Sequence, residues 1–310
     1  MPINIPDALP AREHLERENI FVMTEERAVH QDIRPLNIAI VNLMPTKVAT
    51  ETQLLRLIGN TPLQVNVDLV HTASHQSKNT DPAHLDRFYT SLEQIRTKRY
   101  DGMIITGAPV ETIPFEEVDY WHELAAIMQY SLRNVYSTLH ICWGAQAGLY
   151  HHYGIDKYLL PRKLFGVFEH RRHDDHAPLF RGFDERFPVP HSRYTDVRLA
   201  DVQARPELQV LATSEQAGFC IASAHGGRQV FITGHLEYEV DTLAFEYRRD
   251  AAGGLDTALP QNYFPDDDPS RPPVATWRAH AHLLFANWLN YCVYQETPYD
   301  LAEIEEIGMG

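Results

Sequence analysis

The sequence predicts an α/β protein built on a doubly wound, mostly parallel sheet. Short apolar or β-branched runs, typical of buried strands, recur over about the first 150 residues, at 36–43, 64–70, 102–106 and 136–141. Between them lie segments with apolar side chains three or four positions apart, as at 54–58 and 85–95. Strands that alternate with helices are joined by crossovers, which makes them parallel. In such a sheet the functional residues gather at the carboxyl ends of the strands.

The second half of the chain has a different pattern. Residues 154–206 are rich in His, Arg, Asp and Pro, and we interpret them as loops and an insertion rather than regular elements. Strand patterns return at 208–213, 218–222 and 229–233. Helices are expected at 239–250 and 276–294, the second with Trp277, Leu284, Trp288 and Tyr291 at helical spacing as core residues. We therefore expect an N-terminal extension (1–35), one large domain (36–296) with a C-terminal helix, and a tail (297–310).

Composition excludes several classes of function. The 310 residues carry a formal charge of −15, from 42 acidic and 27 basic side chains, which argues against binding to nucleic acid or anionic lipid. Residues 1–16 contain no apolar stretch of the length that a signal peptide or membrane span needs, so a cytoplasmic protein is expected. The three cysteines are odd in number and far apart, which indicates neither a disulfide framework nor a CxxC zinc site.

Cys142 is the first candidate for catalysis. It ends the strand-like run YSTLHI and precedes WGAQAG, a run poor in bulk that allows a sharp turn into a helix. At a helix N-terminus the dipole favours a thiolate, and the next backbone amides, beginning with that of Trp143, point to where an oxyanion would form. The alternative for this segment alone is a buried structural cysteine, which is what we expect of Cys220 and Cys292.

A second candidate group follows another strand. His235 comes directly after QVFITG, and Glu237 lies two residues further on. In extended chain, residues two apart point to the same side, so the carboxylate would orient the imidazole. A surface pair is the alternative for His-x-Glu alone. The combination is more specific, since both groups lie at the active edge of one predicted sheet.

This layout resembles the class I glutamine amidotransferase-like fold, in which a cysteine at a strand end pairs with a His-x-Glu farther along the chain. The closer resemblance is to the homoserine O-acyltransferase family of methionine biosynthesis. It extends over nearly the whole chain, through NLMPTKVATETQLLRLIGNTPLQV from Asn42, YDGMIITGAP from Tyr100, CWGAQAGLYHHYGI from Cys142, HSRY from His191, TGHLEYE from Thr233, NYFPDDDP from Asn262 and WLNYCVYQETPYDL from Trp288.

The resemblance implies roles for individual residues. Cys142 would be the acyl-thioester nucleophile, His235 the proton acceptor and Glu237 its orienting partner. The resemblance also suggests that three residues contact substrate, namely Lys163, Ser192 and Arg249. An arginine suits an amino-acid carboxylate because its planar fork holds both oxygens; the alternative is a helix-end cation beside Arg248.

Two further residues are candidates at the substrate site. Lys47 follows the first strand, where it would help to hold the oxyanion or the thioester. Glu246 lies three residues before Arg249 on the same helix face, where it would receive the substrate ammonium. The plain alternative for Glu246 is an Arg–Glu helix pair.

Glu111 carries the prediction for the acyl donor. Family members with a small residue at this position resemble succinyltransferases, and those with glutamate resemble acetyltransferases. A carboxylate here would repel the free carboxylate of succinyl-CoA and leave acetyl-CoA unaffected. A nearby Lys or Arg that neutralises Glu111, or a side chain that points away, would weaken this argument.

The expected reaction is ping-pong transfer of acetyl from acetyl-CoA to L-homoserine through a Cys142 acyl-enzyme, without a metal or a bound cofactor. The family resemblance implies a homodimer. Three alternatives stay open: succinyl-CoA as donor or serine as acceptor, an amidotransferase or hydrolase that uses the same triad, and a binding protein without catalysis. A metal site in 169–176 is a further alternative to a solvated loop there, because that segment is rich in His, Asp and Glu.

Overall fold

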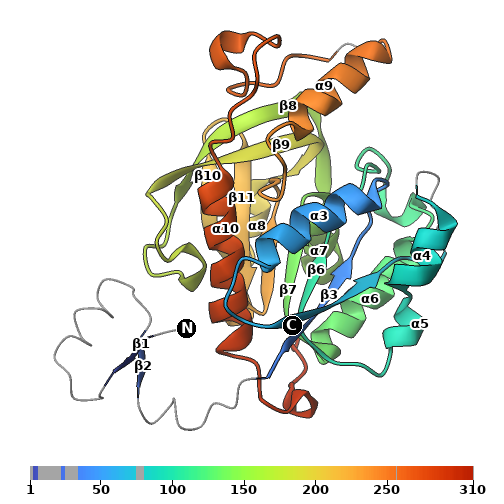
Figure 1. The fold of residues 1–310 in the computed structure, drawn as a ribbon, viewed down its shortest axis with the longest axis vertical. Coiled ribbons are helices and arrows are strands. Elements are labelled where there is room, and N and C mark those ends of the chain that lie inside the picture. Colours follow the sequence, from blue (N-terminus) through green and yellow to red (C-terminus); the bar gives the residue numbers. More distant parts are fainter. Residues whose placement is uncertain (1–2, 6–21, 25–33, 75–79, 256, 310) are drawn as a thin grey trace.

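A ten-stranded sheet organises the protein (Figure 1). The computed structural model describes residues 3–5, 22–24, 34–74, 80–255 and 257–309. The strands lie in the order β5-β4-β3-β6-β7-β12-β11-β10-β8-β9. All pairings from β5 to β12 are parallel, and all pairings from β12 to β9 are antiparallel. The doubly wound, mostly parallel sheet predicted for the first half is therefore confirmed.

The parallel half contains the strands that the apolar runs predict. In sheet order they are β5 (Tyr89–Thr90), β4 (Val65–Val70), β3 (Leu36–Val41), β6 (Tyr100–Ile105), β7 (Val135–Ile141) and β12 (Gln229–Ile232). Nearly every residue of the four from β3 to β12 is buried, as expected for parallel strands covered on both faces. Their carboxyl ends meet at one edge, where β7 leads to Cys142 and β12 leads to His235.

The antiparallel half corrects the prediction of loops at 154–206. This half consists of β11 (Gly218–Ala224), β10 (Leu208–Ser214), β8 (Lys157–Arg172) and β9 (Arg186–Val197). Segment 169–176, interpreted as a solvated loop, begins inside β8 and leaves the strand only after Arg172. The prediction was wrong because both strands lack a simple alternation of polar and apolar residues. Leu159 is exposed at 67%, and five polar side chains fill buried positions, namely His170, His191, Arg193, Thr195 and Asp196.

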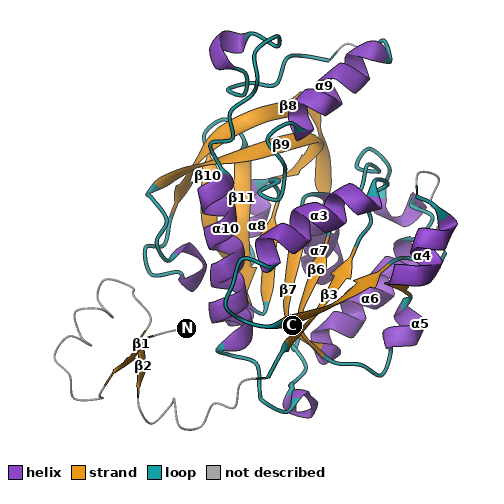
Figure 2. Cartoon of the chain, in the orientation of Figure 1, coloured by secondary structure: helices purple, strands orange, loops and turns teal. Residues whose placement is uncertain are grey.

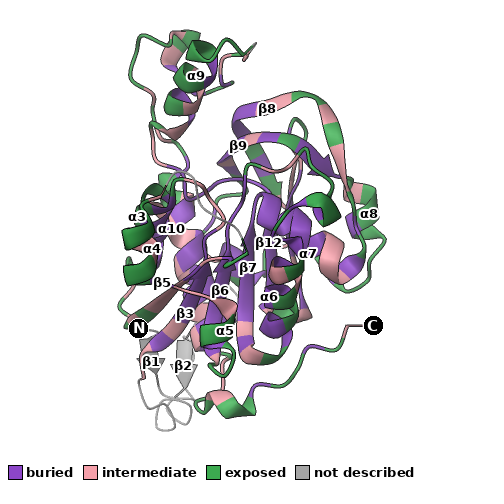
Figure 3. Cartoon of the chain, turned by 90° about the vertical axis from the view of Figure 1, so that its right-hand side faces the viewer, coloured by how far each residue is buried: buried purple, intermediate pink, exposed green. Residues whose placement is uncertain are grey.

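Helices cover both faces of the sheet (Figures 1 and 2). α3 (Lys47–Ile58) and α10 (Arg278–Asn287) pack in one apolar cluster with β3 and β7. α6 (Trp121–Asn134) and α7 (Trp143–Tyr153) pack in a second cluster on the other face. Burial concentrates in the sheet between these layers, as Figure 3 shows. The remaining α-helices of the described residues are α4 (Pro82–Phe88), α5 (Leu92–Ile95), α8 (Leu199–Gln203) and α9 (Thr242–Ala252), of which α9 projects away from the body.

Two predicted helices differ in detail. The segment 85–95 is not one helix, because Tyr89 and Thr90 pair with β4 as strand β5, and Ser91 starts α5 with a capping box. The C-terminal helix keeps α geometry only to Asn287 and continues as a π-helix over Trp288–Tyr294. Of its four aromatic or aliphatic markers, Trp277, Leu284 and Trp288 are buried as predicted, whereas Tyr291 is half-buried.

The segments outside the predicted domain are partly described. Ile304 and Ile307 of the tail are buried, and the amide of Ile307 donates to the carbonyl of Leu132 at the end of α6. Near the N-terminus, β1 (Ile3–Ile5) pairs in parallel with β2 (Val22–Thr24). Within the described ranges, no helix has the length and apolar character required to cross a bilayer.

Gly166 lies where β8 contacts Gln261 in the segment that follows α9, and a substitution there tests this contact. Its φ is +143°, and a Cβ there would lie 2.4 Å from the carbonyl oxygen of Gln261. We expect Gly166→Ala to lower the free energy of unfolding by about 3 kcal/mol, because it combines backbone strain with a clash against main chain. Gly226→Ala is the control, since φ there is +67° with open space around the Cβ, and it should cost about 1 kcal/mol. Urea unfolding of both variants measures the difference, and equal losses would contradict the anchoring.

Candidate active site

Cys142 lies at a strained turn between β7 and α7. Its φ is +52° and its ψ is −118°, a conformation that non-glycine residues rarely adopt. Its amide donates to the carbonyl of Ile232 on β12, at 2.7 Å, which fixes the turn against the neighbouring strand. Outliers of this kind cluster at functional sites, and here the turn presents a nucleophile at the edge of the sheet.

The first turn of α7 borders the thiol on one side. The amides of the first turn of a helix have no partner within the helix, and that of Trp143 directly follows the nucleophile. Gly107, which follows β6, lies so close that a Cβ on it would be 3.1 Å from the Cβ of Cys142 and 3.6 Å from the Trp143 nitrogen. A glycine therefore keeps open the space beside the thiol where an oxyanion at the Trp143 amide would form.

His235 and Glu237 form a hydrogen-bonded pair beside Cys142. Nδ1 of His235 donates to Oε1 of Glu237 at 2.7 Å, which leaves Nε2 for the sulfur. Both side chains are buried. The histidine is held close to β9, since its amide donates to the carbonyl of Pro190 at 2.8 Å. The structure thus brings together the three residues predicted as a triad.

Electrostatics favour a charged imidazole at His235. Burial acts to lower the pKa of His235, but the neighbouring Cys142 and Glu237 outweigh burial through charge and hydrogen bonds. The pKa of His235 is therefore raised well above its ordinary value. An imidazolium that persists near neutral pH stabilises a thiolate next to it, which is the reactive form of cysteine.

A polar cluster lies between β8, β9 and α9 and contains four of the predicted substrate residues. Oε2 of Glu246 accepts from the Ser192 hydroxyl at 2.5 Å and lies 3.5 Å from the Lys163 ammonium. The same ammonium lies 3.2 Å from Oδ2 of Asp250, while the Arg249 guanidinium donates to Oδ1 of Asp250 at 2.8 and 2.6 Å. The hydrogen-bonded partner of Arg249 is therefore its chain neighbour, and Glu246 acts on Arg249 through its charge.

Sequence reasoning missed two members of this region. Asp250 is buried and links the two cations, Lys163 and Arg249. Tyr238 is buried between His235 and Glu246. The run RRD at 248–250 and the tyrosine in HLEY were available signals, but nothing in the sequence places either side chain next to groups far along the chain.

Glu111 points toward β9 and is tied to its backbone. Its Oε2 accepts from the amides of Tyr194 (2.8 Å) and Thr195 (3.3 Å) and from the Thr195 hydroxyl (3.3 Å). Burial raises the pKa of Glu111, and these donors and the charge of His235 oppose the rise. The nearby Lys157 donates to the carbonyl of Ile113, and burial lowers its pKa to about 8.

Lys47 lies at the start of α3, and its ammonium donates hydrogen bonds to the preceding loop. It donates to the carbonyls of Asn42 (2.6 Å) and Met44 (3.5 Å) and lies 5.5 Å from the centre of the Tyr89 ring. Burial lowers its pKa to about 8, although Glu51 opposes this. The described contacts of Lys47 are therefore with its own loop and its neighbours, and the predicted oxyanion role has no support from them.

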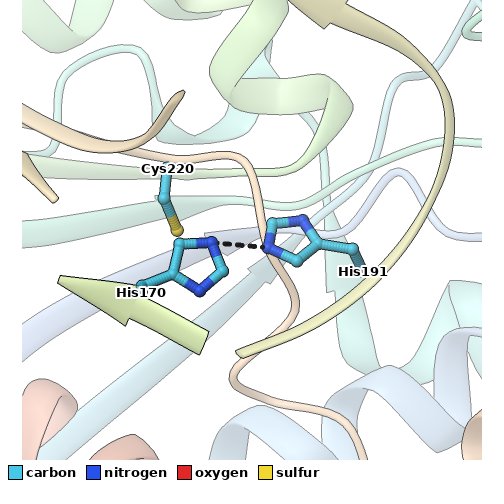
Figure 4. A group of neighbouring side chains, drawn as sticks. All are labelled: His170, His191 and Cys220. Atoms are coloured by element: carbon cyan, nitrogen blue, oxygen red, sulfur yellow. Dashed lines mark hydrogen bonds between the residues drawn. The ribbon is translucent and has the colours of Figure 1, made fainter. Parts of the chain in front are cut away.

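Three buried residues of types that bind metals lie close together. Only one of them, His170, belongs to segment 169–176, where the sequence suggested a metal site. His170, His191 and Cys220 place their ligand atoms within 4.8 Å of one another (Figure 4). Nη1 of Arg193 contacts Nδ1 of His191, so that nitrogen is an acceptor. Nε2 of His191 then donates to Nε2 of His170 (3.1 Å), whose Nδ1 donates to the carbonyl of Phe168.

The guanidinium of Arg193 beside this cluster disfavours a metal. A metal-bound histidine normally donates its second nitrogen to an acceptor, whereas His191 faces a guanidinium. Burial raises the pKa of the Cys220 thiol to about 12. The arrangement fits a chain of hydrogen bonds between neutral rings. Cys220 and Cys292 are buried core residues, as predicted.

Comparisons with known proteins agree with the sequence resemblance. A family model described as homoserine O-succinyltransferase matches residues 2–299. Proteins named homoserine O-acetyltransferase from Acetivibrio thermocellus and Brevibacillus brevis are 61% and 60% identical to this chain. The matches cover 98% and 97% of this chain and 100% and 98% of the relatives.

Solved structures confirm the predicted fold. A glutamine amidotransferase from Thermotoga maritima matches with a TM-score of 0.56 at 13% identity, over 84% of this chain and 99% of that one. A glutamine amido transferase from Methylobacillus flagellatus matches with a TM-score of 0.55 at 14% identity, over 86% and 98%. These likenesses show the glutamine amidotransferase-like fold, and the family model and the full-length relatives together show that this chain belongs to the homoserine O-succinyltransferase family.

Proposed function

We propose that this protein is a homoserine O-acetyltransferase that transfers acetyl from acetyl-CoA to the hydroxyl of L-homoserine through a Cys142 acyl-enzyme. The observation that carries the proposal is Cys142 at a strained strand-to-helix turn beside the hydrogen-bonded His235 and Glu237. Full-length relatives named homoserine O-acetyltransferase support the choice of donor and acceptor.

The first half-reaction forms the thioester. The Cys142 sulfur attacks the acetyl carbonyl carbon, and the carbonyl oxygen becomes an oxyanion near the Trp143 amide. The carbon–sulfur bond to CoA then breaks, and the imidazolium of His235 gives its proton to the departing thiolate. His235 is left neutral, with Glu237 holding its Nδ1–H.

The second half-reaction uses the same groups in reverse. Neutral His235 accepts the proton of the homoserine hydroxyl as the oxygen attacks the thioester carbon. Collapse of the tetrahedral intermediate releases O-acetylhomoserine and the Cys142 thiolate next to the imidazolium. The polar cluster offers matching partners for an amino acid: carboxylate to the cations Arg249 and Lys163, and ammonium to the carboxylate of Glu246.

Glu111 supports acetyl over succinyl. The backbone of β9 holds its carboxylate within electrostatic range of His235. A succinyl carboxylate brought within about 4 Å of it would meet a repulsion of about 4 kcal/mol at an effective dielectric near 20. Acetyl carries no charge and avoids this cost. Serine as acceptor and the amidotransferase reaction are less favoured alternatives, while the homodimer, the cytoplasmic location and the absence of a bound cofactor stay predictions.

Intact-protein mass spectrometry tests the function. The protein is mixed briefly with acetyl-CoA alone or succinyl-CoA alone, and homoserine or serine is then added. We expect one acetyl group on Cys142 that homoserine discharges faster than serine does. A succinyl adduct that homoserine discharges would overturn the choice of donor, and the absence of any adduct would overturn the acyl-enzyme mechanism in favour of the amidotransferase or binding alternatives.

Removing the charge of Glu237 should shift the pH dependence of the nucleophile. In Glu237→Gln the pKa of His235 falls, because one of the interactions that raise it is lost. The imidazolium then loses its proton at lower pH and no longer stabilises the thiolate there. The pH above which His235 no longer supports the ion pair with Cys142, followed by alkylation with iodoacetamide, should therefore move down by about 1 unit, and kcat should fall about 100-fold. Glu239→Gln, two residues further along the chain, is the control. Identical alkylation profiles for Glu237→Gln and the wild type would contradict the pairing.

Asp250 should matter for the acceptor and not for the donor. Asp250→Asn keeps the shape but removes the charge that holds Lys163 and Arg249. We expect kcat/KM for homoserine to fall about 10-fold, with kcat/KM for acetyl-CoA unchanged, because each parameter reports its own half-reaction. Asp241→Asn, an exposed position before the same helix, serves as the control. An equal loss in both parameters would show that Asp250 acts only through stability.

Glu111→Ala should admit succinyl-CoA. Removal of the carboxylate abolishes the repulsion, and we expect the ratio of kcat/KM for succinyl-CoA to that for acetyl-CoA to rise about 100-fold. Glu117→Ala is the matched control, since it removes an exposed charge from the same connection between β6 and α6. Competition between the two donors at equal concentration measures the ratio, and an unchanged ratio would assign donor choice to another part of the site.

A further inference from the structure

Tyr238 is in contact with both the triad and the polar cluster. Its ring stacks on the His235 imidazole, with 4.1 Å between ring centres and 13° between planes. Its hydroxyl donates to Oε1 of Glu246 at 3.1 Å, while Oε2 of the same carboxylate is held by Ser192 and Lys163. One rigid side chain thus joins the base to a carboxylate that the function assigns to the acceptor.

The backbone of Tyr238 is fixed as firmly as its ring. Its amide donates to the carbonyl of His235, and its carbonyl accepts from the indole of Trp277 at 3.0 Å. Trp277 is itself fully buried, at 1% exposure. Burial, followed by the charge of Glu246, raises the pKa of Tyr238 well above its ordinary value. The phenol therefore stays protonated, and Glu246 is the acceptor of its hydrogen bond.

The acceptor molecule needs these two anchors at once. Homoserine carries its ammonium and its reacting hydroxyl at opposite ends of a short carbon chain. The hydroxyl must reach His235 while the ammonium is bound by Glu246. The distance and angle between His235 and Glu246 therefore decide whether the hydroxyl oxygen can attack the thioester carbon. Tyr238 is the side chain that spans that separation.

We propose that Tyr238 is a positioning residue of the second half-reaction: its ring sets the plane of the His235 imidazole, and its hydroxyl sets the carboxylate of Glu246 that receives the acceptor. This inference rests on the proposed function and adds a specificity element to it. The first half-reaction involves no acceptor, so it depends on the ring of Tyr238 but not on its hydroxyl. Among the described residues, the titratable or charged groups that interact with His235 or Tyr238 include Cys142, Glu237, Glu246, Glu111, His191 and Arg249.

Two variants separate the two contacts. Tyr238→Phe keeps the stacked ring and removes the hydroxyl. We expect kcat/KM for homoserine to fall about 10-fold while kcat/KM for acetyl-CoA stays within about twofold of wild type. Tyr238→Leu also removes the stacked ring, and we expect both parameters to fall and the pH profile of Cys142 alkylation to change.

A matched control separates positioning from stability. Tyr130 on α6 has the same exposure as Tyr238, 9%, and its buried hydroxyl donates to the carbonyls of Lys98 and Ile95 away from the site. Tyr130→Phe should lower the melting temperature as Tyr238→Phe does, without the split between the two kinetic parameters.

The outcomes have distinct meanings. A selective loss for homoserine in Tyr238→Phe, absent from Tyr130→Phe, would support the proposal. If the wild type is active, equal losses in kcat/KM for homoserine and for acetyl-CoA in Tyr238→Phe, or no loss in either, would overturn the proposal. If wild-type protein transfers no acetyl to homoserine, the proposed function itself fails, and that result is read from the wild type before any variant is compared.

Discussion

The positive φ of Cys142 is the constraint on which the rest of the site depends. A residue in that conformation costs on the order of 1–3 kcal/mol, and it persists only where the surroundings determine it. Here the Cys142 amide is bound to Ile232, and the backbone at Gly144 lies so close to the end of β6 that a Cβ there would be 2.5 Å from the carbonyl oxygen of Thr106. The close packing of α7 against β6 and β12 thus holds the thiol at the sheet edge, beside Gly107 and His235.

The two halves of the sheet contribute different chemistry to this edge. The parallel half presents Cys142 at the end of β7 and His235 after β12, which is the common layout of its fold. The antiparallel ribbon β8–β9 carries Lys163 and Ser192, and its backbone holds Glu111. In terms of the proposed mechanism, the nucleophile belongs to the shared fold. The ribbon inserted after α7 shares the selection of donor and acceptor with Glu111 and with the residues of α9.

The sequence allowed prediction of those features that are encoded by residues close together in the chain. Cys142 and His235 were predictable because each follows an apolar strand that is visible in the text. The ribbon was not, because His170, His191 and Arg193 contact one another in the folded protein, and partners up to 21 positions apart are invisible to a local pattern. Tyr238 was missed although its partners His235 and Glu246 are only three and eight positions away, because no periodic pattern indicates that its ring stacks on one and its hydroxyl bonds to the other.

The ion pairs of Asp250 with Lys163 and Arg249 explain how so acidic a protein can hold the amino acid of the proposed reaction. In the free site Lys163 and Arg249 are already paired with Asp250, so a simple carboxylate would have to compete with a buried anion for them. A zwitterion is different, because its ammonium brings a positive charge to Glu246 as its carboxylate approaches Arg249. The local charge stays balanced only for a ligand that carries both groups. The cluster therefore favours an amino acid over a hydroxy acid through charge balance, without requiring any net positive surface.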